Sequence, residues 1–434
     1  MLKPSMSLSA LVSSQAKRSP NAIAICAPGR EPLTYARLAV QVSTVVKTLN
    51  ANGVGRHDRV AIVLPNGPEM AVTFLAVAAG ATSAPLNPAY RAKEFDFYPS
   101  FVRTSLEDLS AKALIILASL DSPARAVAEA RGIPIIELKP MLEESAGLFT
   151  LTGADHAKAP SRQNPIQPSV LSGFAQLDDV ALILHTSGTT SRPKMVPLTH
   201  QNICTSAHNI ASTLKLTEKD RCLNVMPLFH IHGLIGATLS SLMAGGSLVC
   251  TPGFDAEQFF VWMEACKPTW YTAVPTMHQA VLAGASSHRQ TIARHPLRFI
   301  RSSSASLPPK LMAELEQVFN APVIESYGMT EASHQMTSNP LPPRKRKPGS
   351  VGIPAGPEVA IMDEAGTDPA PKSGQACLSA GRIGEIVILG TDVTLGYANN
   401  QQANQKAFTN GWFRTGDQGY FDSDGYYAQG VSRK

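Results

Sequence analysis

The sequence predicts an α/β protein of more than one domain. Short apolar runs alternate with helix-like stretches between residues 36 and 326, and this alternation is typical of strands covered by helices. The 434 residues are enough for two to three domains of roughly 150 residues each. Apolar side chains make up 44% of the chain and charged ones 16%, which excludes an intrinsically disordered protein.

The amino-terminal part is expected to form a first set of helices and strands. An amphipathic helix over residues 36–49 precedes a buried strand at 59–64, a helix at 68–79 and another strand at 113–118. Residues 153–174 are rich in Pro, Ser and Gln, which is typical of a linker.

The middle of the chain repeats the pattern. Short apolar runs predict six strands, at 180–184, 221–226, 247–251, 270–274, 297–302 and 322–326. The uncharged stretch 233–250 contains four glycines, so we expect a buried helix, a turn and a strand rather than a membrane span. From Val351 onwards, short strands and Gly/Asp turns predict an appended β-rich subdomain.

Charge and cysteine usage narrow the class of protein. A net charge of +5 without a basic stripe interleaved with aromatic residues argues against nucleic-acid binding. The six cysteines are far apart and lack metal-ligand spacing, so they are expected to be buried thiols in a reducing compartment. The first 20 residues lack the apolar run of a secretory signal. We therefore expect a globular intracellular protein.

A hydroxyl-rich turn follows the strand at 180–184. The segment HTSGTTSRPKMVPLTH (185–200) offers hydroxyl groups around a glycine that lets the backbone approach an anion, and a lysine suited to phosphate. Its spacing differs from that of the GxxxxGK[ST] loop, and the alternative is an ordinary polar turn. The residues of this predicted phosphate loop are Thr186, Ser187, Gly188, Thr189, Thr190 and Lys194.

A second segment, ESYGMTEASHQM (325–336), also follows a short strand. Tyr327 supplies a flat face for a base, Thr330 a hydroxyl for a phosphate, and Glu331 an oxygen for Mg²⁺. Because ligands of α/β sheets collect beyond the carboxyl ends of strands, this segment and the hydroxyl-rich turn could face one crevice. The alternative is that Tyr327 is an ordinary core residue.

Two further motifs are weaker by themselves. Asp417, in a TGD turn, could accept hydrogen bonds from ribose hydroxyls, although aspartates in turns usually only form the turn. His230 and His232 would share one face of a strand, as a metal pair requires, but no third ligand has suitable spacing, so zinc is disfavoured. The basic loop 340–348 is expected to be a solvated surface loop rather than a phosphate site.

Together these segments resemble the adenylate-forming superfamily of acyl-CoA synthetases, luciferases and peptide-synthetase adenylation domains. The similar segments are TSGTTSRPK, ESYGMTE, GWFRTGD, GEIVILG and KPGSVGIP. Longer matches are similar to the oxalate–CoA ligase branch, namely FHIHGL, WYTAVPTMHQ, FIRSSSASLPP and MTEASHQMTSNPLP.

The resemblance implies two stacked α/β subdomains with mixed sheets, at 1–176 and 177–350, and a small β-barrel-like subdomain at 351–430. Residues 431–434 would begin the hinge to a mobile C-terminal domain that is missing here. That domain would dock on the active-site face, so the resemblance implies an impaired enzyme. Segments 99–105 and 372–380 look like insertions relative to the family.

The resemblance also implies a role for each matching residue. The loop ending at Lys194 would hold the β- and γ-phosphates of ATP, Thr330 would contact the α-phosphate, and Glu331 would bind Mg²⁺. Asp417 and Arg433 would hold the ribose. The residues along or beside the adenine would be Ser303, Ser304, Ala305, Glu325, Ser326, Tyr327, Gly328 and Met329.

His230 would lie between the α-phosphate and the substrate carboxylate, and the acid pocket would contain His232, Ser302, His334 and Gln335. The implied reaction is ATP-dependent activation of a carboxylic acid as an acyl-adenylate, followed by transfer to coenzyme A, with Lys194, His230, Thr330 and Glu331 at the reacting groups. The polar pocket suits a very small dicarboxylate such as oxalate.

Three alternatives stay open: a CoA ligase for a short or medium-chain fatty acid or an aromatic acid, a carrier-coupled adenylation domain, and a non-enzymatic nucleotide-binding remnant. The expected location is the cytoplasm or the peroxisome.

Overall fold

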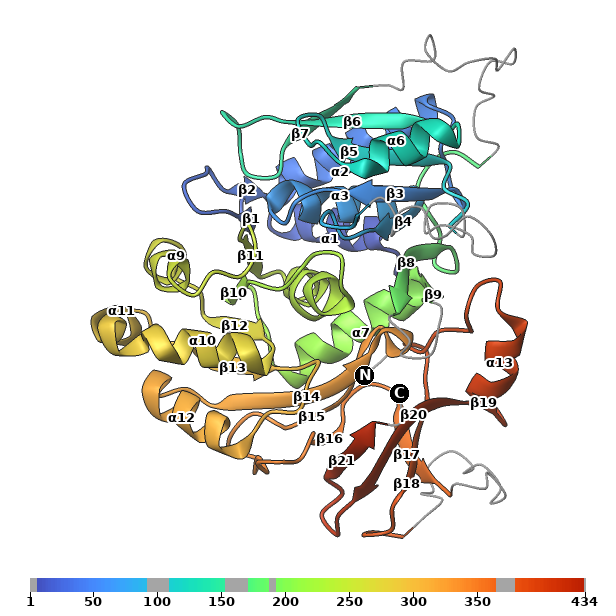
Figure 1. Ribbon diagram of the computed structural model, residues 1–434. Helices are drawn as coiled ribbons and strands as arrows, with labels where there is room; N and C mark the ends of the chain where they lie inside the picture. Colours follow the sequence, from blue (N-terminus) through green and yellow to red (C-terminus); the bar gives the residue numbers. More distant parts are fainter. Residues whose placement is uncertain (1–5, 92–108, 153–170, 187–192, 364–378, 433–434) are drawn as a thin grey trace.

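The computed structural model describes residues 6–91, 109–152, 171–186, 193–363 and 379–432, which form three β-sheets and their covering helices (Figure 1). This architecture confirms the predicted α/β class with an appended β-rich part. The predicted linker at 153–174 lies outside the described residues up to residue 170, as do segment 99–105 and most of segment 372–380.

The first sheet has seven strands in the order β7-β6-β5-β3-β4-β8-β9. Strands β3 to β6 and β8 are parallel, while β7 and β9 run antiparallel at the two edges. Parallel strands are buried on both faces and need continuous apolar runs, such as RVAIV in β3 and ALIIL in β5. The members are β3 (Arg59–Val63), β4 (Thr82–Pro85), β5 (Ala113–Leu117), β6 (Ile135–Pro140), β7 (Phe149–Thr152), β8 (Val180–Thr186) and β9 (Lys194–Thr199).

The second sheet has nine strands in the order β16-β15-β14-β13-β12-β10-β11-β1-β2. Its centre is parallel, and β2, β15 and β16 pair antiparallel at the ends. The members are β1 (Ile23–Cys26), β2 (Leu33–Thr34), β10 (Arg221–Asn224), β11 (Ser247–Cys250), β12 (Trp270–Ala273), β13 (Phe299–Ser302), β14 (Val323–Met329), β15 (His334–Ser338) and β16 (Ile353–Pro354).

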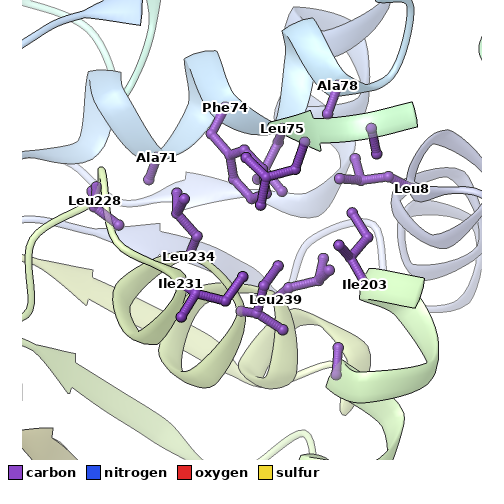
Figure 2. Packing of buried hydrophobic residues seen from close by; sticks show 14 of the residues in the cluster. Leu8, Ala71, Phe74, Leu75, Ala78, Ile203, Leu228, Ile231, Leu234 and Leu239 are labelled. Atoms are coloured by element: carbon purple, nitrogen blue, oxygen red, sulfur yellow. The ribbon is translucent and has the colours of Figure 1, made fainter. Parts of the chain in front are cut away.

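A shared layer of helices joins the two sheets. Helix α3 (Pro68–Ala78) is apolar all round and almost every residue in it is buried, as expected of a helix between two sheets. Figure 2 shows Phe74 and Leu75 of α3 facing Leu234 and Leu239 of the next layer. Among the other helices whose buried residues join this core are α1 (Leu8–Arg18), α2 (Tyr35–Ala51), α7 (His200–Thr213), the π-helix η2 (His232–Leu239) and α8 (Ser240–Met243).

The remaining helices lie outside this layer or are short. They are α6 (Pro123–Ala130), α9 (Gln258–Cys266), α10 (Pro275–Ala285), the single turn η3 (Ser286–His288), α11 (Arg289–Arg294), α12 (Pro309–Phe319), the single turn η4 (Thr330–Ala332) and α13 (Gln401–Ala407).

The third sheet is antiparallel and confirms the predicted β-rich part after Val351. Its order is β17-β18-β20-β19, with β21 added on β20 (Figure 1, red). The members are β17 (Glu358–Met362), β18 (Gly384–Leu389), β19 (Phe408–Thr409), β20 (Trp412–Phe421) and β21 (Tyr427–Ser432). The ten-residue β20 carries the TGD turn motif within a strand.

The sheets exchange strands across residue 176. Strands β8 and β9 complete the first sheet, whereas β1 and β2, from the start of the chain, complete the second. Each of the two large sheets therefore contains strands from both sides of residue 176. The predicted subdomain boundaries at 176 and 350 stay predictions.

Two predictions about buried segments are confirmed. The stretch 233–250 forms a buried helix, a turn and the strand β11, although the helix begins as a π-helix. Within the described residues no helix is long and apolar enough to cross a membrane. Five cysteines are buried free thiols, while Cys377 lies outside the described residues.

Candidate active site

Segments from all three sheets meet at the carboxyl end of β14. Tyr327 at that end donates a hydrogen bond of 2.5 Å through its hydroxyl to Oδ2 of Asp417 on β20. Glu331 in the turn η4 accepts a hydrogen bond of 2.8 Å from the hydroxyl of Tyr397, and Nζ of Lys194 lies 4.7 Å from the centre of the Tyr397 ring. The predicted base, ribose, metal and phosphate residues are thus brought into one neighbourhood.

Tyr327 and Asp417 are both buried, and the proton of their hydrogen bond stays on the Tyr327 hydroxyl. Burial, reinforced by the charge of Asp417, holds the pKa of Tyr327 well above its usual value, so the phenol remains the donor. Asp417 lies within β20 and not in the expected turn, and its backbone N–H donates to the Thr415 hydroxyl at 3.1 Å. The ring that would support a base therefore also orients the carboxylate that would bind ribose.

The two ends of the predicted phosphate loop are placed by the β8–β9 hairpin. Thr186 pairs with Lys194 across the hairpin, and its hydroxyl donates to the Lys194 carbonyl at 3.5 Å. Ser187, Gly188, Thr189 and Thr190 lie outside the described residues, as does Arg433 of the predicted hinge.

A serine-rich strip runs beside Tyr327. The Ser303 hydroxyl donates to the Ser326 carbonyl at 3.0 Å, which ties the end of β13 to β14. Ser304 adopts a positive φ of 70°, and both Ser304 and Ala305 are exposed. Ser304 and Ala305 are thus accessible close to the end of β14, and their contact with adenine stays a prediction.

Gly328 and Met329 complete the end of β14, with Thr330 following half-buried in η4. A Cβ at Gly328 would lie 1.5 Å from the His334 carbonyl oxygen, so only glycine permits the close approach of β15 at this bulge.

Glu325 is a buried acid with one satisfied oxygen. Oε1 accepts the Leu307 N–H at 2.9 Å, while Oε2 has no partner in the described part of the chain. Burial raises the pKa of Glu325 to about 7 from an ordinary value of 4.5, partly offset by the Leu307 hydrogen bond.

This raised pKa predicts a pH-dependent stability. The folded state holds the Glu325 proton more tightly than the unfolded state, so the stabilisation is complete below pH 4.5 and is lost as the pH rises through about 7. At 1.36 kcal/mol per pH unit, the free energy of unfolding should fall by up to about 3 kcal/mol. Glu325→Gln should remove this part of the pH dependence, as measured by urea unfolding between pH 5 and 8. An identical slope in the variant would contradict the assignment.

The predicted acid-pocket histidines form a buried stack. The rings of His232 and His334 lie 4.8 Å apart at 27°, and His232 also contacts the Ser304 hydroxyl through Nδ1 at 3.0 Å and the Thr272 hydroxyl through Nε2 at 2.6 Å. Burial, together with the neighbouring Arg301 cation, holds the pKa of both rings well below the usual value. Both histidines are therefore neutral at physiological pH.

Arg301, which the sequence analysis did not single out, lies beneath this stack. Its Nη1 donates to Nε2 of His334 at 3.0 Å and its Nη2 donates to Oε1 of Gln335 at 3.2 Å. The side chain is fully buried on β13, yet no carboxylate contacts it within the described ranges, and Nε has no partner there. Burial lowers the pKa of Arg301 only to about 10, so it remains a cation.

The signal for Arg301 was present in the sequence. A charged residue in the short apolar run FIRS of a central strand must be buried, and a buried charge needs an explanation. A Cβ at Gly236 of η2 would lie 2.6 Å from Nε2 of His334 and 3.2 Å from Nη1 of Arg301, so the glycine leaves room for both groups.

The other two residues predicted for the acid pocket are Gln335 and Ser302. Nε2 of Gln335 donates to the Ala355 carbonyl at 2.9 Å and to the Thr213 hydroxyl at 3.3 Å. These bonds fix the amide whose Oε1 accepts from Arg301. Ser302 is buried at the end of β13, where strand alternation places it on the opposite face from Arg301.

The expected strand placement of His230 and His232 is wrong. His230 lies in a bend and is exposed, and His232 opens the π-helix η2, because Pro227 and the following turn end the extended chain after β10. Asn66, in the loop between β3 and α3, holds this bend by accepting the Leu228 N–H at 2.7 Å and donating to the Met226 carbonyl at 3.3 Å. The described residues contain no cluster of three or more His, Cys, Asp or Glu that could hold a metal ion.

This arrangement is typical of an α/β enzyme that binds a nucleotide beyond the carboxyl ends of its strands. Comparison with known families makes the class specific: the family described as AMP-binding enzyme matches residues 12–398, and the chain belongs to it.

Named relatives agree with the family. The chain is 46% identical to a probable CoA ligase of Humulus lupulus, covering 93% of this chain and 73% of the relative. It is 43% identical to an oxalate–CoA ligase of Arabidopsis thaliana, covering 96% of this chain and 77% of the relative. The ATP-bound structure of MatB from Rhodopseudomonas palustris superposes with a TM-score of 0.80 at 29% identity, over 98% of this chain and 78% of that one.

These findings confirm the predicted superfamily and the predicted enzyme class, an acid–thiol ligase that uses ATP and coenzyme A. The roles of the individual site residues stay predictions.

Proposed function

We propose that this chain activates oxalate, forming oxalyl-adenylate from ATP and then a thioester with coenzyme A. The observation that carries the proposal is Arg301, a fully buried cation that no carboxylate contacts within the described residues. A buried charge without a counter-ion is costly, so an anionic ligand that reaches it gains a strong, desolvated partner.

The surroundings of Arg301 favour a small dianion over a longer acid. The neutral rings of His232 and His334 line this place without a competing charge, and the Ser304 hydroxyl, which contacts His232, adds a polar group beside them. Oxalate is short enough to place one carboxylate near Arg301 and the other at the α-phosphate. The name of the Arabidopsis relative, an oxalate–CoA ligase, agrees with this choice.

The nucleotide would lie across the opposite side of the site. Tyr327 would support the adenine against Ser303 and Ser304, Asp417 would accept the ribose hydroxyls, and Lys194 would neutralise phosphate charge. Thr330 would contact the α-phosphate.

Mg²⁺ fits this arrangement through Glu331. Mg²⁺ is usually held by one or two carboxylates together with substrate phosphates rather than by an all-protein cage, and Glu331 supplies one buried carboxylate beside Lys194 and Tyr397. When bound, the ion neutralises phosphate charge and withdraws electron density from the reacting phosphorus.

The chemistry then follows in two balanced steps. An oxalate oxygen attacks the α-phosphorus, and the bond to pyrophosphate breaks. The coenzyme A thiol releases its proton to water, its sulfur bonds to the activated carbonyl carbon, and the bond from that carbon to the AMP oxygen breaks so that AMP leaves. The exposed His230 would lie between the α-phosphate and the carboxylate, where its ring could hydrogen-bond the oxygens that gain charge.

The three alternatives have less support. A fatty or aromatic acid pocket would bury apolar atoms against Arg301 and two histidines, which leaves polar groups unpaired. An amino-acid-activating domain would be expected to hold the α-amine with an aspartate near His230, and none is adjacent in the sequence. A non-enzymatic nucleotide-binding remnant could keep Lys194, Glu331 and Asp417, but it would not need the buried cation Arg301 beside two histidines.

We further propose that the relatives' additional length includes a mobile domain that docks on this face and completes catalysis, since the chain spans 73% and 77% of the two relatives. The enzyme would act in the cytoplasm or in the peroxisome.

Binding and exchange measured together test the proposed substrate. Calorimetry with non-hydrolysable acyl-sulfamate analogues should give the tightest binding for the oxalyl analogue, by about 10-fold or more over the malonyl, butyryl, coumaroyl and glycyl analogues. Pyrophosphate exchange should show the same order of acids. Tighter binding of the butyryl or coumaroyl analogue would overturn the dicarboxylate assignment, and a glycyl preference would favour a carrier-coupled domain.

A further inference from the structure

Tyr397 lies between β18 and α13 in the β-rich part, outside the segments in which nucleotide residues were predicted. The side-chain amide of Asn404 binds both the backbone N–H and the backbone carbonyl of Tyr397. The Tyr397 N–H donates to Oδ1 of Asn404 at 2.7 Å, and Nδ2 of Asn404 donates to the Tyr397 carbonyl at 2.9 Å. The side chain thus projects from a held position rather than from a freely moving loop.

The segment that carries Tyr397 is also bound to both sides of the active site. The Ala398 N–H donates to the Met195 carbonyl of β9 at 3.0 Å, and the Thr394 hydroxyl donates to the Pro197 carbonyl at 2.8 Å. The Thr394 N–H donates to the Glu331 carbonyl at 2.7 Å. Residues 394–398 therefore link the strand that begins with Lys194 to the turn that carries Glu331.

The side chain of Tyr397 contacts both of these charged groups through different atoms. The hydroxyl donates to Oε1 of Glu331 at 2.8 Å, while Nζ of Lys194 lies over the ring face at 4.7 Å from its centre. In this bond the phenol O–H is the donor and the Glu331 carboxylate oxygen the acceptor. A cation over an aromatic face is attracted to the ring quadrupole.

We propose that Tyr397 is a positioning residue for adenylation: its hydroxyl orients Glu331 toward Mg²⁺, and its ring restrains Lys194 near the phosphates. Holding Oε1 in one hydrogen bond fixes the carboxylate plane and directs the remaining lone pairs of Glu331 toward a cation. This inference rests on the proposed roles of Glu331 and Lys194.

Two substitutions separate the hydroxyl from the ring. In Tyr397→Phe, the increase in ATP affinity caused by Mg²⁺ should shrink about 10-fold, because outer-shell partners of metal ligands typically contribute that much. ATP binding without Mg²⁺ should be unchanged. Tyr397→Leu should lose the same Mg²⁺ effect and should also weaken ATP binding without the ion, because Lys194 loses its aromatic contact.

Tyr427→Phe is the matched control, because the Tyr427 hydroxyl makes a comparable 2.8 Å hydrogen bond to the Val359 carbonyl in the same sheet. Calorimetric titration of ATP with and without Mg²⁺ is the readout, supported by the Mg²⁺ dependence of pyrophosphate exchange. Equal Mg²⁺ effects in Tyr397→Phe and Tyr427→Phe would overturn the inference. Failure of the protein with its proposed mobile domain present to exchange pyrophosphate with any acid would instead count against the proposed function, because the titrations need no acid.

Discussion

Replacing Arg301 by methionine is expected to abolish the selective activation of oxalate. Removing one partner of a buried, hydrogen-bonded charge pair costs about 3–5 kcal/mol. At 1.4 kcal/mol per factor of ten, kcat/KM for oxalate should fall by about 10²–10³-fold. The apolar methionine should at the same time leave activation of butyrate unchanged or improve it, because the variant no longer buries an unpaired cation beside that acid.

The comparison requires that the variant fold and bind nucleotide. Arg301 makes its two side-chain hydrogen bonds to His334 and Gln335 and lies away from the Tyr327–Asp417 pair, so ATP affinity should stay within about 3-fold of wild type. Arg301→Lys keeps the charge but loses the fork that pairs with a carboxylate, and should give an intermediate loss. Retention of oxalate activity in Arg301→Met, with normal ATP binding, would show that the second carboxylate binds elsewhere.

Replacing Glu331 by glutamine is expected to have the second large effect. The variant keeps an oxygen for the Tyr397 hydroxyl but loses the negative charge proposed to bind Mg²⁺. Pyrophosphate exchange should fall by about 10²-fold or more at physiological Mg²⁺, and the increase in ATP affinity caused by Mg²⁺ should nearly vanish. Calorimetry and exchange over a range of Mg²⁺ concentrations measure both effects.

Glu325→Gln supplies the matched control for Glu331→Gln. Both residues are buried glutamates on or just after β14, but Glu325 accepts the Leu307 N–H and has no contact with Tyr397 or Lys194. The control should keep the normal Mg²⁺ dependence. In the double variant Glu331→Gln/Tyr397→Phe, the losses should not add, because both changes act on the same carboxylate. Additive losses would show that Glu331 and Tyr397 act independently, which contradicts the proposal.

Much of the fold is predictable from the sequence because its signals are local. The apolar runs of β3, β5 and β12 mark buried strands, and the all-apolar α3 marks a helix between layers. The exchange of β1 and β8 between the two large sheets depends on pairing across about 100 residues for β8 with β4 and more than 200 for β1 with β11, which no local pattern records. The π-helix η2 has the same apolar composition as an ordinary buried helix, so its different turn is not visible either.

The candidate site likewise contains some residues that sequence motifs reveal and others that only the tertiary fold reveals. Lys194, Tyr327, Glu331 and Asp417 follow strands or turns in recognisable motifs, and the structure brings them together. Arg301 and Tyr397 act through contacts with residues from other strands, so their partners are set by the tertiary fold. The strand expected to carry His230 and His232 is not formed, because Pro227 and the helix that follows decide the local backbone.

The most direct test of the account is a crystal structure of the protein with AMP and oxalate bound. The account predicts that one oxalate carboxylate lies about 2.7–3.0 Å from the Arg301 guanidinium, the range of charge-assisted hydrogen bonds, with the His232–His334 stack beside it. The other carboxylate should face the phosphate of an AMP whose base rests on Tyr327. Oxalate bound away from Arg301, with the guanidinium still contacting only His334 and Gln335, would contradict it.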